Sequence, residues 1–180
     1  MKTALILFAE GTEELEAVTL INILRRGGVN VTVAGLHGGP LRGSRGTVLL
    51  PDTTLDEALA HDYDMVVLPG GQPGTSNFKA DTRVLKLVRQ MNEAGKYVAA
   101  ICAAPSVLAE AGLLKGKRAT CYPTCLDAYP DVNLQTSAIA EDGKIITSRG
   151  PGTAMDFALT LLERLAGQKK RQEIEADLVR

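Results

Sequence analysis

Residues 97–114, YVAAICAAPSVLAEAGLL, contain the transition that decides the fold. The six residues Tyr97 to Cys102 form a short apolar run of the kind found in buried strands. From Ala103 onward the sequence is typical of a helix. A buried strand that leads into a helix is the repeating unit of folds with a parallel sheet. A cysteine is the last residue before the change.

The same alternation continues on both sides of this stretch. Further strands are predicted at 4–9, 29–36 and 63–71, a short strand, turn and helix at 47–59, and helices at 13–26, 81–94 and 153–166. Thr12 is the predicted N-cap of the first helix, and Asp142-Gly143 the turn of a hairpin. The charged tail after residue 166 is predicted to be a solvated helix. We therefore predict one α/β domain over residues 1–180, with a mostly parallel sheet covered by helices on both faces.

Composition narrows the class of function. The net charge of −1 and the lack of a basic stripe argue against a nucleic-acid or anionic-membrane partner. No apolar run is long enough to span a bilayer. The N-terminal apolar run is followed at once by acidic residues and has no cleavage site, so a cytoplasmic protein is expected. Three cysteines, an odd number, argue against a disulfide framework.

Cys102 is the first candidate for chemistry. A residue on a tight strand-to-helix turn is held exposed at the rim of the sheet, as in the nucleophile elbow of hydrolases. The N–H groups and partial positive charge of the following helix N-terminus are expected to lower the pKa of a thiol there. The alternative is a small buried core residue, because free cysteine is often buried.

Two further features adjoin predicted strand ends. Gly70-Gly71 lets backbone N–H groups approach an oxyanion, or simply forms a turn that needs positive φ. Glu13, Glu14 and Glu16 are typical of a solvated first helical turn, but Glu16 shares a helix face with Leu20 and is the one expected to point inward.

Several site types are disfavoured. His37, in a glycine-rich loop, and His61, before a strand, are each expected at the surface, so no histidine base is assigned. Cys121 and Cys125 lack the second ligand pair of a zinc site. No phosphate-binding glycine motif follows a strand. We therefore predict no metal and no cofactor.

Six segments together resemble the ThiJ/PfpI superfamily, in the branch of the parkinsonism-associated deglycase and its bacterial homologues. They are EGTEELEAV (10–18), LRRGGVNVTVAGL (24–36), SRGTVLLPD (44–52), YDMVVLPGG (63–71), VAAICAAP (98–105) and TSRGPGTAMDFAL (147–159). The resemblance implies a flavodoxin-like sandwich and a homodimer. It also implies action on methylglyoxal, glyoxal or their glycated adducts, oxidation sensing and chaperone-like protection.

The resemblance assigns roles to individual residues. The reactive cysteine of the family falls on Cys102, and the buried glutamate that hydrogen-bonds to its sulfur falls on Glu16. The oxyanion donors fall on Gly71 and Ala103, and Gly70 and Pro151 shape the pocket. Two arginines near the site and the dimer seam fall on Arg26 and Arg45.

Two positions depart from the family. Peptide-hydrolysing relatives have a histidine directly after the cysteine, where this chain has Ala103, so protease activity is disfavoured. The deglycase branch often has a histidine where TCYPTC (120–125) has Tyr122, a poor base at neutral pH. The first hypothesis is an enzyme that acts on α-oxoaldehydes. The alternative is a redox-responsive protective protein without significant turnover.

Overall fold

The computed structural model describes all residues 1–180. Its elements, in chain order, are β1 (Thr3–Phe8), α1 (Glu14–Arg26), β2 (Asn30–Gly35), β3 (Leu41–Arg42), β4 (Val48–Leu49), β5 (Thr53–Thr54), α2 (Leu55–Ala58), β6 (Met65–Leu68), α3 (Gly74–Ala80), α4 (Thr82–Glu93), β7 (Tyr97–Ile101), α5 (Pro105–Glu110), β8 (Arg118–Ala119), β9 (Asn133–Leu134), β10 (Ile139–Asp142), β11 (Ile145–Ser148), the 3₁₀ helix η1 (Pro151–Thr153), α6 (Ala154–Ala166) and α7 (Gln168–Asp177).

The central sheet has seven strands in the order β10-β11-β7-β6-β1-β2-β5. All neighbours are parallel except β10 and β11, which form the hairpin predicted at Asp142-Gly143. The sequence-based prediction of a mostly parallel sheet is therefore confirmed. The carboxyl ends of β1, β6 and β7, which are neighbours in the sheet, bring the segments after Phe8, Leu68 and Ile101 to one edge.

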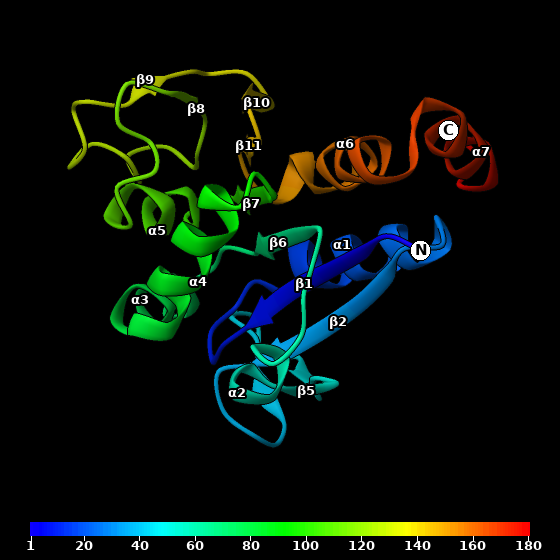
Figure 1. Ribbon diagram of the computed structural model, residues 1–180, viewed down its shortest axis with the longest axis horizontal. Coiled ribbons are helices and arrows are strands. Elements are labelled where there is room, and N and C mark those ends of the chain that lie inside the picture. Colours follow the sequence, from blue (N-terminus) through cyan, green and yellow to red (C-terminus); the bar gives the residue numbers. More distant parts are fainter.

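Helices cover both faces of the sheet (Figure 1). Along β1, Leu5 and Leu7 pack on the face covered by α2, α3, α4 and α5. Ala4, Ile6 and Phe8 pack on the opposite face against α1, α6 and α7. Successive side chains of a strand point to opposite faces, so a strand buried on both sides is apolar throughout. This explains why the strands lack polar alternation.

Two element boundaries near the strand ends differ from the prediction. The helix after Cys102 begins at Pro105 rather than Ala103, and it has only six residues. The N-cap of α1 is Glu13 rather than Thr12. The Thr12 hydroxyl does not cap the helix. It accepts a hydrogen bond from the Ala9 N–H, just after β1.

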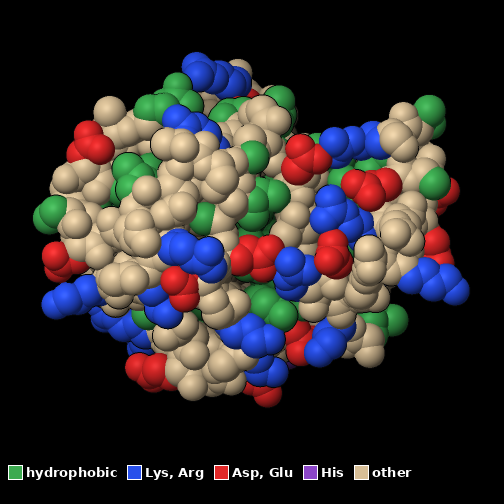
Figure 2. Space-filling view, turned by 90° about the horizontal axis from the view of Figure 1, so that it is seen from above, with side chains coloured by type: hydrophobic (Ala, Val, Ile, Leu, Met, Phe, Trp, Pro, Cys, Tyr) green, Lys and Arg blue, Asp and Glu red, His purple; other side chains and the backbone are tan.

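No helix in the structure combines the length and the apolar character required to cross a lipid bilayer. Figure 2 shows acidic and basic side chains interspersed on the face drawn. Such mixing of both signs gives no extended basic patch on that face.

Candidate active site

Cys102 directly follows β7 and has a left-handed backbone, with φ of 65°. Its N–H donates to the carbonyl oxygen of Ser148 at the end of β11 (3.0 Å), and its own carbonyl accepts from the Tyr122 N–H (2.8 Å). These bonds hold a conformation that is unfavourable for a residue with a side chain. The turn resembles the nucleophile elbow, because it lifts the side chain out of the strand at the rim of the sheet. The residue is only 8% exposed, so the prediction of an exposed side chain at this turn is wrong, and Cys102 is buried against Ile101 and the helices of its face.

Glu16 lies in the first turn of α1 and is completely buried. Its Oε2 accepts a hydrogen bond from the Gly70 N–H at 2.7 Å. Its Oε1 has no hydrogen-bond partner in the protein. A buried carboxyl oxygen without a partner is costly as an anion, and this favours the protonated acid. One of the three glutamates of this turn therefore points inward, as predicted.

Gly70 lies between the cysteine and the glutamate. A Cβ atom at this position would lie 2.6 Å from the Cys102 Cβ, 2.8 Å from the Ile101 carbonyl oxygen and 3.0 Å from Glu16 Oε2. Two of these contacts are too short for real Cβ atoms, and one involves backbone that cannot swing away. Glycine is therefore required for Glu16 and Cys102 to approach each other.

The thiol and the carboxyl titrate as one system. Burial raises the pKa of Glu16 to about 7, against the opposing effects of the Gly70 N–H and the Cys102 side chain. Burial also raises the pKa of Cys102, and the Glu16 carboxylate raises it further, while the Ala103 N–H lowers it. Two adjacent buried anions repel each other, so the pair loses one proton near pH 7 and retains the second strongly.

The expected lowering of the pKa of Cys102 by a helix N-terminus is wrong. The helix α5 begins three residues after the cysteine and has only six residues, so its dipole acts weakly on the sulfur. Burial and the neighbouring carboxyl outweigh the Ala103 N–H, the one favourable backbone group. Any activation of the thiol has to come from moving its proton to Glu16.

The backbone N–H groups of the two predicted oxyanion donors, Gly71 and Ala103, have no backbone acceptor, and the Ala103 N–H acts on the Cys102 sulfur. Gly71 has φ of 92°, a conformation that glycine adopts without strain. The oxyanion role of both N–H groups stays a prediction.

Tyr122 and Pro151 flank the same turn. The Tyr122 N–H bonds to the Cys102 carbonyl, its side chain is 51% exposed, and its ring lies against Gly150. Pro151 begins η1 three residues after Ser148, which holds the Cys102 N–H. The Tyr122 backbone therefore lies next to the cysteine, and the role that the resemblance gives to Pro151 stays a prediction.

The two arginines lie elsewhere in the chain's own structure. Arg26 is in the last turn of α1, ten residues after Glu16, which is about 15 Å along a helix. There its Nε donates to the Asn22 side chain. Arg45 lies in the exposed turn between β3 and β4, where its backbone N–H donates to the Glu14 carboxylate. Within a single chain, no contact links either guanidinium group to Cys102.

No histidine supplies a base at this site. His37 lines a separate hollow beyond β1 and β2, together with Glu10, Asn77 and Asp81. His61 lies after α2, next to Tyr63 in another hollow. Glu16 is therefore the titratable side chain that the structure places beside the cysteine.

All three cysteines are free thiols. Cys121 packs into the core on the α4 and α5 side, whereas Cys102 packs on the α1 and α6 side. Burial raises the pKa of Cys121 to about 11 and also raises that of Cys125. No group of three or more His, Cys, Asp and Glu side chains is arranged to hold a metal ion.

We expect the raised pKa of Glu16 to make the protein less stable as the pH rises. Below about pH 4.5 the carboxyl is protonated in both the folded and the unfolded state, so it has no effect. Between pH 4.5 and 7 the unfolded chain releases the proton first, so the free energy of unfolding falls by up to about 3 kcal/mol. Denaturant unfolding of wild type and Glu16→Gln from pH 4 to pH 8 measures this. A wild-type curve parallel to that of the variant would contradict it.

The chain matches the model of the DJ-1/PfpI family over residues 2–164, and it belongs to this family. Protein dj-1beta of Drosophila melanogaster is 44% identical over 183 aligned residues, which cover 99% of this chain and 97% of the relative. Glutathione-independent glyoxalase DJR-1.2 of Caenorhabditis elegans is 34% identical, with 96% and 94% covered. The crystal structure of Drosophila melanogaster DJ-1beta superimposes with a TM-score of 0.95 at 42% identity, covering 99% and 97%.

Proposed function

We propose that the protein converts α-oxoaldehydes such as methylglyoxal, or their adducts with thiols and amines, to 2-hydroxy acids, as a glyoxalase or deglycase. The observation that carries this is the buried carboxyl with a pKa of about 7 beside a cysteine on a strained strand-to-helix turn. A relative named as a glutathione-independent glyoxalase supports the same activity. The test is whether wild type, but not Cys102→Ala, forms lactate from methylglyoxal.

The reaction depends on the proton that Cys102 and Glu16 exchange. Glu16 takes the thiol proton as Cys102 Sγ bonds to the aldehyde carbon, which gives a hemithioacetal. The N–H groups of Gly71 and Ala103 stabilise the oxyanion that forms.

Glu16 gives the thiol proton to this oxyanion and is a carboxylate again. It then takes the hydrogen of the former aldehyde carbon as a proton, and the electron pair of that C–H bond forms the double bond of an enediol. The hydroxyl proton passes to the former ketone oxygen, Glu16 returns its proton to the neighbouring carbon, and the C=O of a thioester forms. Water hydrolyses the thioester, releasing the 2-hydroxy acid and restoring the thiol.

The second candidate is a redox-responsive protective protein without significant turnover. The absence of any histidine at the site favours it, since Tyr122 occupies the position next to the cysteine carbonyl. Suppression of client aggregation, measured with methylglyoxal turnover before and after mild peroxide, separates the two. Turnover far above that of a free thiol rules out a protein that only protects.

We expect Tyr122→His to raise turnover of methylglyoxal at neutral pH. The backbone N–H of residue 122 is bonded to the Cys102 carbonyl, and imidazole transfers protons near pH 7 where a phenol does not. The gain is up to about 10²-fold in kcat/KM. Tyr122→Phe, which keeps the ring, is the control and should show no gain. An unchanged rate in a folded Tyr122→His protein would show that Glu16 alone suffices.

The three free thiols support a reducing compartment, because the cysteines of secreted proteins usually pair as disulfides. We therefore assign the protein to the cytoplasm. Its partner there is a small aldehyde or a glycated adduct.

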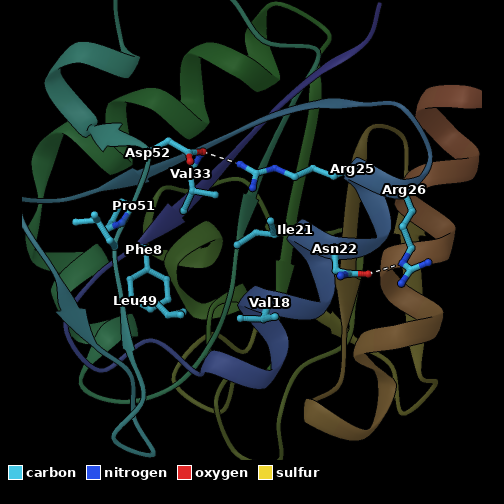
Figure 3. Close-up of a pocket in the computed structure, with 11 residues that line it drawn as sticks. Phe8, Val18, Ile21, Asn22, Arg25, Arg26, Val33, Leu49, Pro51 and Asp52 are labelled. Carbon is cyan, nitrogen blue, oxygen red and sulfur yellow. Dashed lines mark hydrogen bonds and ion pairs between the residues drawn. The ribbon is translucent and has the colours of Figure 1, made fainter.

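The protein is also proposed to be a homodimer through α1 and the segment after β4. Val18 and Ile21 of α1 face Leu49 and Pro51 across an apolar groove, whose rim carries the Arg25–Asp52 ion pair (Figure 3). Four apolar residues of α1 and of the β4 segment, two of which line the groove, are 44–74% exposed: Leu15, Val18, Val48 and Leu50. An exposed apolar face of this kind suits an isologous contact with a second copy.

We expect wild type to sediment as a dimer at micromolar concentration and Val18→Glu as a monomer. A two-fold contact repeats the new charge on both sides, so it buries two like charges. Leu134→Glu, on the separate β9 strand, is the matched control because Leu134 is 50% exposed. Monomeric wild type would rule out the dimer.

A further inference from the structure

We propose that Glu13 is a positioning residue that holds Glu16 against the Gly70-Gly71 turn and keeps a negative charge beside its carboxyl. This rests on the proposed function, because Glu16 is its acid–base group. Sequence reasoning treated Glu13 as part of a solvated turn. The structure separates the three glutamates of that turn by their contacts: Glu14 binds the β3–β4 turn, Glu16 is buried, and Glu13 is half-buried and caps α1.

Glu13 and Glu16 both bind Gly70, Glu13 at the Gly70 carbonyl oxygen and Glu16 at the Gly70 N–H. Glu13 Oε2 accepts from the Glu16 N–H at 2.8 Å, as the N-cap of α1. The Glu13 N–H donates to the Gly70 carbonyl at 2.8 Å, while the Gly70 N–H donates to Glu16 Oε2 at 2.7 Å. The three bonds close a ring through both glutamates and Gly70. A shift of Glu13 therefore shifts the acid–base group.

Glu13 also contacts Gly71, one of the two predicted oxyanion donors. A Cβ atom on Gly71 would lie 2.4 Å from the Glu13 backbone nitrogen and 3.0 Å from its Cβ. Glu13 and Gly71 are thus in direct backbone contact. The same residue therefore sets the position of the Glu16 carboxyl and of the Gly71 N–H.

Glu13 also acts on Glu16 through its charge. The groups that act on the Glu16 proton are the Gly70 N–H before α3, Cys102 after β7, and Glu13 on α1 itself. Glu16 forms no ion pair, and no cationic side chain contributes. Glu13 is the only carboxylate that raises the pKa of Glu16, after the larger effect of burial. An ordinary cap residue, Ser, Thr or Asn, would hold the helix without this charge.

The test is the titration of the Glu16 carboxyl, followed by carbon NMR in wild type, Glu13→Gln and Glu14→Gln. Glutamine keeps an oxygen that accepts from the Glu16 N–H but removes the charge. We expect the Glu16 midpoint to fall by about half a pH unit in Glu13→Gln and to stay unchanged in Glu14→Gln. An unchanged midpoint in Glu13→Gln, or an equal fall in both variants, would overturn the proposal.

A second measurement tests position. Glu13→Ala removes both cap and charge, and we expect it to lower kcat for methylglyoxal about tenfold with little change in KM, because the acid–base group is displaced. Glu13→Gln should restore most of this rate and move the pH profile of kcat/KM with the Glu16 midpoint. Equal kcat in Glu13→Ala and wild type would overturn the positioning role. If wild type shows no aldehyde turnover but the Glu16 midpoint still falls in Glu13→Gln, only the proposed function is refuted.

Discussion

We expect Cys102→Ala to lose at least about 10³-fold in the rate of 2-hydroxy acid formation from methylglyoxal. Without sulfur no hemithioacetal forms, and removing a nucleophile abolishes every later covalent step. The loss should appear in kcat, because the Gly71 and Ala103 N–H groups remain to bind the substrate oxygen. Alanine fits the site, since Cys102 is small and its turn is held by backbone bonds to Ser148 and Tyr122.

The matched control for this variant is Cys125→Ala. It removes a half-buried thiol that has the smallest of the named effects on the pKa of Cys102. Wild-type rates in Cys125→Ala together with loss in Cys102→Ala assign the chemistry to one sulfur. Equal rates in wild type and Cys102→Ala would remove Cys102 from the mechanism.

The second large effect is expected for Glu16→Gln, with a loss of about 10²–10⁴-fold in kcat. The amide has the size of the acid and still accepts from the Gly70 N–H, so the fold is kept. It cannot take the thiol proton or carry a proton between carbons. The control is Glu14→Gln. Glu14 lies in the same helical turn but binds the β3–β4 turn, so this variant should retain wild-type turnover.

The dependence of kcat/KM on pH also tests the role of Glu16. In wild type kcat/KM should rise through about pH 7, where one proton leaves the Glu16–Cys102 pair. In Glu16→Gln this step should vanish. A rise near pH 7 that persists in Glu16→Gln would mean that another group titrates.

The fold and the reactive turn could be predicted because their signals are local. Apolar strands without alternation indicate a sheet covered on both faces, and the change at Cys102 marks the end of one such strand. Helix α3 was missed because Gly74, Thr75 and Ser76 are weak helix formers. It forms because Phe78 is fully buried in the core and the Thr75 N–H bonds to the Gly71 carbonyl.

The electrostatics of the site could not be predicted from sequence. Glu13, Glu14 and Glu16 look alike in one turn, and their different roles depend on partners 30 or more residues away, at Gly70 and at Arg45. The predicted direction of the Cys102 pKa shift was wrong for a related reason. The pKa depends on how deeply the thiol is buried and on where α5 begins, and neither can be read from the sequence. Family resemblance located Arg26 near the site, but helix length separates it from Cys102 within one chain.

The most direct test of the central claim is the rate at which wild-type protein alone turns methylglyoxal into lactate, followed by proton NMR at pH 7.5 against an equal concentration of free cysteine. The account predicts lactate formation at least about 10²-fold faster than with the free thiol, because the site holds the thiol, the acid–base group and two oxyanion donors together. A rate no greater than that of free cysteine would contradict it.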